Sequence, residues 1–325
     1  MFVKYPSIDN LRTVIKEQKK FNPLSLSKTI SLEGTTKIHG TNAGVTVDLV
    51  RNCSFQSRNR ILSVDDDNFG FASFASGNQD FFKRMADRVD YKDFDNVTFF
   101  GEWCGGNIQK NIGISGMEKA FVVFSVVLSK NDDEQKEFID IEFVKSCFDI
   151  RVFNVRDFGV FCVDLVMNNT DSLMAVEQLT SDLEKNCPVA LQLNPSGNMI
   201  GEGIVWSSQD GRVRFKQKGE KHAIAGSSPK VKIEAPITGE AEIAVNCFLD
   251  QAVSLDRLKQ SADYLLEMGF DFTTKNTGNY IKWMNKDVLK ELRFEIDDIK
   301  EKHGIEWKYL CKIITNVSKE HFNNL

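Results

Sequence analysis

The chain has 325 residues, of which 42% are hydrophobic and 27% are charged, and its net charge is −5. This composition is typical of a folded globular protein, and it excludes long disordered tracts and a surface that is basic as a whole. No apolar run approaches the ~20 residues of a membrane span, and the cysteines are scattered without metal-ligand spacing. We therefore expect a cytoplasmic protein of two domains, because a single core rarely grows past about 250–300 residues.

The first predicted elements lead to a lysine in a tight loop. Residues 9–20 have the apolar spacing of a helix, and alternating apolar positions predict strands over 30–37 and 43–50. Between the strands the chain reads Lys-Ile-His-Gly-Thr-Asn, from Lys37 to Asn42. A lysine followed three residues later by glycine occurs by chance about once in a chain of this length. The assignment of this loop as a functional site therefore depends on the segments that follow it.

Three of these segments offer polar or aromatic side chains near strand ends. A strand from Cys53 runs into a loop at Arg58, whose planar guanidinium suits a phosphate or ribose edge, although a surface salt bridge explains it equally well. We expect Glu102 at the exposed mouth of a strand over 97–106, because burying an unpaired carboxylate is costly. Phe124 lies in a predicted buried strand, where a core role is more frequent than base stacking.

A predicted hairpin carries a basic face. Strands over 201–206 and 211–218 are joined by Asp210-Gly211, a strong hairpin signal. By the period of two, Arg214, Lys216 and Lys218 share one face. Three cations on one face repel one another unless they face solvent or an anion, and with a nucleophilic lysine upstream a bound phosphate accounts for them better. Glu202 lies at the start of this hairpin.

The remaining segments are predicted to be mainly helical. The chain from 131 to 149 is predicted to be a turn followed by a solvated helix, and a linker-like turn occupies 226–229. Helical periodicity predicts helices over 81–89, 171–185, 253–268, 287–302 and 305–322. We predict a sheet-rich domain over residues 1–232 and a small all-helical domain over residues 233–325.

In the order of its motifs the chain resembles the covalent nucleotidyltransferases, the superfamily of polynucleotide ligases and mRNA-capping enzymes. It is most similar to the RNA ligase 2 family of T-even phages, in which histidine replaces the usual aspartate two residues after the lysine. Thr36 is a departure, because the family usually has glutamate there. The resemblance implies an α+β fold, with a mainly antiparallel-sheet, ATP-grasp-like adenylylation domain before the helical domain. It rests on Lys37, His39, Gly40, Asn42, Arg58, Phe100 to Glu102, Phe124, Glu202, Gly203, Lys216 and Lys218, and extends to residues 1–5 and 105–111.

The resemblance implies an ATP-dependent RNA ligase. Lys37 would attack the α-phosphorus of ATP, release pyrophosphate and carry AMP as a phosphoramidate, and neighbouring cations would favour the neutral amine that this attack requires. The AMP would pass to a 5′-phosphate, and a 3′-hydroxyl would then displace it. The implied partner is nucleic acid with these two ends, RNA favoured, held by the helical domain. The implied setting is RNA repair by a monomer, in the host cytoplasm if the protein is phage-encoded.

The resemblance also implies roles for individual residues. Glu102 and Arg58 would hold the ribose and a neighbouring phosphate, and Phe124 would stack on adenine. Lys216 and Lys218 would bind the α-phosphate, and Glu202 would anchor Mg²⁺ or Mn²⁺ through water. His39 and Asn42 would line the phosphate side of the pocket.

Three alternatives stay open. A DNA ligase or an RNA-to-DNA ligase would keep every motif and differ only in the strand ends it accepts. A capping guanylyltransferase fits less well, because it normally has the aspartate form of the lysine motif and a barrel-type C-terminal domain. A non-enzymatic protein that binds nucleic-acid ends is disfavoured, because all the chemical residues are present.

Overall fold

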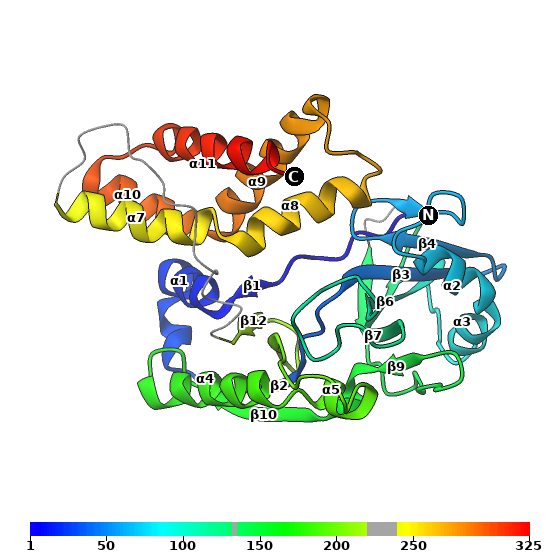
Figure 1. The fold of residues 1–325 in the computed structure, drawn as a ribbon. Helices are drawn as coiled ribbons and strands as arrows, with labels where there is room; N and C mark the ends of the chain where they lie inside the picture. Colours follow the sequence, from blue (N-terminus) through cyan, green and yellow to red (C-terminus); the bar gives the residue numbers. More distant parts are fainter. Residues whose placement is uncertain (132–134, 220–238) are drawn as a thin grey trace. The chain divides into compact units, whose positions relative to one another are not determined.

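The computed structural model describes residues 1–131, 135–219 and 239–325, and the chain divides into two compact units (Figure 1). The first unit consists of Met1–Ile8 and Leu24–Gly219, and the second of Asp9–Pro23 and Glu220–Leu325. The first unit contains the sheets and the second is helical, which confirms the predicted α+β class. Among the described residues, none of the helices combines the length and the apolar character needed to cross a membrane.

The larger sheet of the first unit is antiparallel along the order β5-β4-β3-β6-β7-β8, and β9 pairs with β7 in parallel. Its strands are β3 (Thr41–Asp48), β4 (Cys53–Ser57), β5 (Ile61–Leu62), β6 (Asn96–Cys104), β7 (Ala120–Ser129), β8 (Lys136–Ile139) and β9 (Val152–Asn154). Alternation along β3 buries Ala43, Val45 and Val47 in one core, which α2 (Phe71–Gly77) and α3 (Gln79–Ala86) help to form. The opposite face of this sheet remains for the site.

The smaller sheet has, within the first unit, the antiparallel order β12-β11-β2-β10. Its strands are β2 (Ile30–Thr36), β10 (Val160–Leu165), β11 (Gly203–Ser208) and β12 (Arg214–Lys218), with η1 (Pro23–Ser27) before them and η2 (Val155–Phe158) between them. Trp206 and Phe215 are paired across β11 and β12 and are fully buried. The helix α4 (Thr170–Lys185), capped by Asn169, contacts both strands, and α5 (Pro188–Leu193) follows it. One face of the sheet thus packs against the hydrophobic core, and Lys216 and Lys218 lie on the opposite face.

The first residues of the chain cover part of the site face of the larger sheet. Gln56 is buried at 2% exposure, and its side-chain amide exchanges two hydrogen bonds with the backbone of Val3, at 2.9 and 2.8 Å. Tyr5 packs its ring 4.8 Å from that of Phe100 and 5.3 Å from that of Phe124, centroid to centroid. Each buried polar atom of Gln56 is therefore paired, as an interior amide requires.

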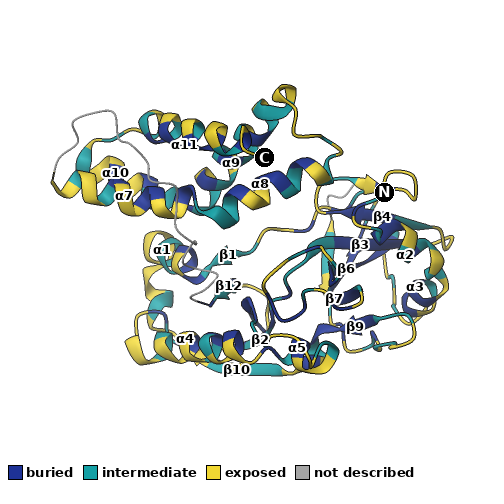
Figure 2. Ribbon diagram, viewed as in Figure 1, coloured by how far each residue is buried: buried dark blue, intermediate teal, exposed yellow. Residues whose placement is uncertain are grey.

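The second unit has two hydrophobic clusters and includes an N-terminal helix. Its elements are β1 (Asp9–Asn10), α1 (Leu11–Phe21), α7 (Glu240–Ala252), α8 (Leu255–Glu267), η3 (Thr274–Asn276), α9 (Thr277–Glu291), α10 (Arg293–His303) and α11 (Trp307–Phe322). One cluster joins α7, α10 and α11, and the other joins α8 and α9 to Phe322. Each helix has a buried and an exposed side (Figure 2), which is the amphipathic pattern expected of a small bundle.

The units differ from the predicted domains in the placement of α1. Glu295 on α10 accepts ion pairs from Arg12 at 3.3 Å and Lys16 at 3.1 Å, and Arg293 pairs with Glu17. These contacts join α1 to the helical unit, although it precedes the sheets in sequence. The predicted boundary at 232 and the predicted turn at 226–229 lie outside the described residues.

Some predicted elements were wrong. The solvated helix expected within 131–149 is absent from the described part of that segment, which instead contributes β8 to the edge of β7. Pairing with a sheet edge has overridden the local pattern there. The single helix predicted over 287–302 is broken at Leu292 into α9 and α10, and α7 was missed. The Asp-Gly hairpin is confirmed as β11 and β12.

Candidate functional site

The nucleophile candidate, Lys37, follows the last residue of β2 and is held there by the backbone of β11. Its N–H donates to the carbonyl of Gly203 at 2.8 Å. In the β11–β12 pair, Gly203 lies opposite Lys218. Two residues further along β11, Val205 lies opposite Lys216 of β12 and Thr35 of β2. Gly203 has no room for a side chain, because a Cβ would lie 2.1 Å from the carbonyl oxygen of Gln217. The register therefore directs Lys37, Lys216 and Lys218 to one face.

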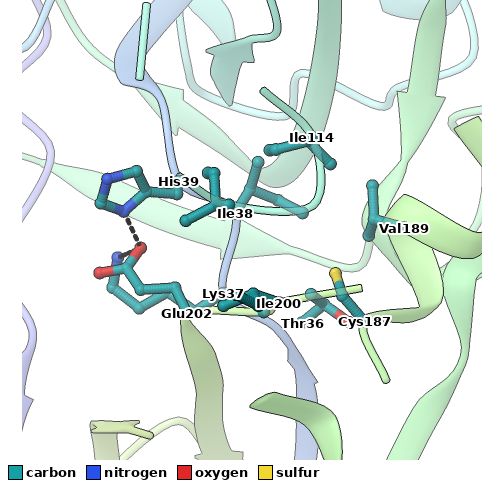
Figure 3. Close-up of a pocket in the computed structure, with 11 residues that line it drawn as sticks. Thr36, Lys37, Ile38, His39, Ile114, Cys187, Val189, Ile200 and Glu202 are labelled. Carbon is teal, nitrogen blue, oxygen red and sulfur yellow. Dashed lines mark hydrogen bonds and ion pairs between the residues drawn. The ribbon is translucent and has the colours of Figure 1, made fainter. Parts of the chain in front are cut away.

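Glu202 connects three of the predicted site residues. Its carboxylate is 2.6 Å from Lys37 Nζ, 2.9 Å from His39 Nδ1 and 3.1 Å from Lys218 Nζ, and its side chain is 2% exposed. Figure 3 shows this carboxylate between Lys37 and His39. Burial acts to raise the pKa of Glu202, but the charges of Lys37, Lys218 and His39 outweigh it and hold that pKa well below its usual range. Glu202 is thus a buried, ionised carboxylate that the positive charges around it stabilise.

The loop after Lys37 brings a second carboxylate, Glu102, into the site. The N–H of Gly40 donates to Glu102 Oε1 at 3.1 Å, and a Cβ on Gly40 would collide with the carbonyl of Trp103. Glu102 was expected at an exposed mouth, and it is instead partly buried. Burial and the charge of Glu202 raise the pKa of Glu102 to about 7, against the opposing effect of Lys37. The carboxyl group is accommodated here because it can remain protonated.

Asn42, Arg58 and Phe124 lie on the same sheet as Glu102. Asn42 is directly opposite Glu102 in the β3–β6 register, and its Oδ1 is buried without a hydrogen-bond partner in the described part of the chain. Arg58 is exposed just beyond β4, and its charge acts on Glu102. Phe124 is the extra residue of a β-bulge, since Phe100 pairs with Ser125 and Gly101 with Val123. A bulge redirects one side chain out of the regular alternation.

The basic face of β12 divides into two parts. Lys216 and Lys218 remain beside the site, but Arg214 is used elsewhere. Its guanidinium stacks 5.2 Å from the ring of Tyr5 and 5.9 Å from that of Phe138, and it donates a hydrogen bond to the Tyr5 hydroxyl. The prediction that all three cations face one phosphate is wrong for Arg214, because two aromatic rings already occupy its guanidinium.

A small pocket opens beside Lys37 (Figure 3). Its lining is mostly apolar, and it includes the buried hydroxyl of Thr36, which has no partner among the described residues. The lining residues are Thr36, Lys37, Ile38, His39, Ile112, Ile114, Cys187, Val189, Ile200, Gly201 and Glu202.

A family model described as RNA ligase matches residues 31–221, which is more than half of the chain and includes every predicted site residue. The chain belongs to the RNA ligase family. Its fold is similar to solved structures of a Naegleria gruberi RNA ligase. A lysine-to-alanine variant without ligand is 18% identical with a TM-score of 0.46, and a lysine-to-methionine variant with AMP and Mn is 16% identical with a TM-score of 0.47. Each match covers 68% of this chain and 57% of the Naegleria protein, so this RNA ligase family member spans less than two thirds of those ligases.

The donor set of this RNA ligase family member fits a hydrated hard cation. Among the described residues, no three or more His, Cys, Asp or Glu side chains gather as a metal cage. Mg²⁺ does not need one, because it keeps several waters and takes one or two carboxylates together with phosphate oxygens. The ionised Glu202 is such a carboxylate, but the cation would compete with Lys37 for its oxygens.

Sequence reasoning gave no role to Gln109. Its Oε1 is 3.1 Å from His39 Nε2, and the other ring nitrogen of His39 is the one that contacts Glu202. The imidazole is therefore fixed from both sides. Gln109 lies in the 105–111 segment that resembles the phage family, but nothing in its spacing from His39 predicts the contact.

Proposed function

We propose that this RNA ligase family member is an ATP-dependent polynucleotide ligase that joins RNA ends through a covalent AMP on Lys37. The observation that carries the proposal is the Lys37 amine, 2.6 Å from a buried and ionised Glu202 beside Lys218. The chain offers a nucleophile, a metal-binding carboxylate and phosphate-binding cations within one face. Family membership supports the same reaction class.

In the first step Lys37 Nζ forms a bond to the α-phosphorus of ATP, and pyrophosphate leaves with the electron pair of the bond that breaks. The attacking amine loses a proton to water. An amine held as an ammonium by Glu202 has no lone pair for this attack. The pair between Lys37 and Glu202 therefore opens first, and Glu202 becomes available to hold Mg²⁺ or Mn²⁺. When bound, that ion supplies neutralisation of the phosphate charge.

The other residues bind and orient the nucleotide. Lys216 and Lys218 provide fixed positive charge for the α-phosphate, which phosphoryl transfer needs more than it needs acid–base chemistry. Phe124, redirected by its bulge, stacks on adenine, and Glu102 and Arg58 hold the ribose and a neighbouring phosphate. His39 and Asn42 line the phosphate side. Gln109 acts through His39 as a positioning residue.

In the following steps AMP moves from Lys37 to a 5′-phosphate, and a 3′-hydroxyl then attacks that phosphate and releases AMP. We assign the adenylylation chemistry to the sheet unit and the grip on nucleic acid to the helical unit. RNA is the favoured substrate by family. Nicked duplexes of RNA, DNA and the two hybrids, offered to the purified protein, separate an RNA ligase from a DNA or RNA-to-DNA ligase by the rate at which each is sealed.

The decisive test is covalent labelling. Protein incubated with α-labelled ATP and Mg²⁺ is expected to retain label on a denaturing gel, with the label mapped to the peptide containing Lys37. Lys37→Ala is expected to retain none. Lys92→Ala is the matched control, because Lys92 is an exposed lysine of the same unit paired with Glu137 at 2.8 Å. Label that persists in Lys37→Ala, or GTP labelling preferred over ATP, would contradict the proposal.

A further inference from the structure

Two helices of the second unit, α9 and α11, pack side by side in antiparallel directions. Tyr280 Oη is 2.8 Å from His321 Nδ1, and further along Asn285 Nδ2 donates to Thr315 Oγ1 at 3.2 Å. Residue numbers rise on one helix as they fall on the other. Neither Asn285 nor Thr315 is buried, so their contact marks the accessible side of the α9–α11 pair, and residues three or four positions away lie on that same side.

Lysines gather on this side. Lys282 lies three residues before Asn285, and Lys312 and Lys319 lie three before and four after Thr315. Lys308 precedes Lys312 by one turn, and Lys286 follows Lys282 by one turn. All are exposed. We call this set the α9/α11 lysine face: Lys282, Lys286, Lys308, Lys312 and Lys319.

The carboxylates of α9 are directed to its neighbours. Asp287 accepts an ion pair from Arg257 on α8 at 2.8 Å, and Glu291 accepts a hydrogen bond from Asn10 at 3.2 Å. On α11 the only carboxylate is Glu320, in a helix that carries three lysines. On these two helices the lysines therefore outnumber the carboxylates.

The other helices of the bundle show the opposite balance. Together α7 and α10 carry seven carboxylates against three Lys or Arg side chains. The lysines of α10 are paired nearby, Lys300 with Glu306 at 3.2 Å and Lys302 with Asp298 at 3.6 Å. The bundle is thus polarised, with α9 and α11 positive and α7 and α10 negative.

We propose that the α9/α11 lysine face binds the phosphate backbone of the nucleic acid that this protein joins, a proposal that rests on the ligase function above. Along α11 the lysines span eleven residues, about 16 Å at 1.5 Å per residue, which is long enough to follow several phosphates. Only Leu289 adds a large exposed apolar side chain to this side, at 46% exposure. The face is therefore suited to a polyanion and not to a protein partner with an apolar core.

Lysine contacts to phosphates carry no sequence information, which suits an enzyme that must accept any break. They also explain how an acidic protein holds an acidic substrate: counterions released from the duplex supply the free energy, provided that the cations are gathered in one place.

The test compares two double variants that remove equal charge from the same bundle. Lys312→Ala/Lys319→Ala removes two lysines of the face, and Lys300→Ala/Lys302→Ala removes two from α10. Binding to a fluorescein-labelled blunt RNA duplex is measured by anisotropy between about 50 and 200 mM salt. The first variant is expected to bind on the order of tenfold more weakly, with a slope of log K against log salt that is shallower by about two. The α10 variant is expected to match the wild type.

Equal affinities and equal salt slopes for the two variants would overturn the proposal, as would a weaker α10 variant. Thermal unfolding of both variants excludes loss of fold as the cause of weaker binding. The wild-type protein is assayed in parallel for covalent AMP, so that the two proposals fail separately. Absence of the AMP adduct would contradict the proposed ligase function. The salt slopes test separately whether the lysine face binds the phosphate backbone.

Discussion

Glu102 and Glu202 belong to one site, yet their surroundings favour opposite charge states. Lys37, Lys218 and His39 contact Glu202, and they hold its pKa well below the usual range despite burial. Glu102 receives one backbone N–H, from Gly40, and burial raises its pKa to about 7. The difference follows from the number of direct cationic contacts, because desolvation disfavours both carboxylates.

Glu102 makes the stability of the protein depend on pH. Its folded pKa of about 7 exceeds the ordinary value of 4.5, so between these values the folded state binds more protons than the unfolded state. Stability therefore falls as the pH rises from about 4.5 to about 7, and no further change from this group follows above that. Glu102→Gln is expected to flatten this dependence and to stabilise the protein at pH 8 by on the order of 2 kcal/mol.

Urea unfolding of the wild type and of Glu102→Gln at several pH values between about 5 and 8 measures this difference. Glu177→Gln, at an exposed position on α4, controls for the loss of a charge. Parallel pH profiles for the wild type and Glu102→Gln would show that Glu102 is not protonated in the folded protein.

The polar residues of the site could be predicted as a set because each lies in or next to a strand, in a recognisable order. The structure brings Lys37, His39, Glu202 and Lys218 into direct contact, while their chemical roles stay predictions. Sequence reasoning could not give the partners of Gln109 and Arg214. Both contacts join segments far apart in the chain, and neither a period of two nor a helical period encodes them.

At the scale of elements, the N-terminal segment and the β7 bulge act together. Tyr5 packs against Phe124 on one side and is capped by Arg214 of β12 on the other. The segment Met1–Ile8 thereby connects the bulge to the smaller sheet. The side chain proposed to stack on adenine is supported by a residue far from it in sequence.

Tyr5→Ala is expected to destabilise the sheet unit by about 3 kcal/mol, because Tyr5 is 6% exposed and its removal leaves a cavity beside Phe100 and Phe124. It is also expected to weaken ATP binding, measured as a higher ATP concentration for half-maximal labelling. Tyr5→Phe keeps the ring and loses only the hydrogen bond to Arg214, at a cost of about 1 kcal/mol. Should both variants unfold at the same urea concentration, ring packing would not be the source of the stability.

The elements that sequence predicted well have strong local signals. The β11–β12 hairpin has its Asp-Gly turn, and α8 and α11 have clear helical periodicity. The errors arise where tertiary contacts determine the type of an element or where it ends. The chain after Asn131 pairs with β7 instead of forming a helix, and the break at Leu292 separates two helices whose apolar positions appeared continuous.

At the scale of the whole molecule, the two units have separate hydrophobic cores. We expect two calorimetric unfolding transitions. The residues proposed to bind the nucleotide all belong to the sheet unit. ATP should therefore raise the free energy of unfolding for only one transition, by about 2.7 kcal/mol at a concentration 100 times its Kd. The Lys37→Ala variant, which lacks the proposed attachment site for AMP, is the protein for this measurement. A single transition that ATP shifts as a whole would show that the units unfold as one.

The ion pairs between α1 and α10 impose an order on biosynthesis. Lys16 and Glu295 are 279 positions apart, and at about 5–20 residues per second the ribosome needs roughly 15 to 55 s to supply the second after the first. Throughout that interval the nascent chain carries α1 without its docking helix, while the intervening sheets can already fold. A shortened gene that stops after β12 would leave α1 in this unfinished condition permanently.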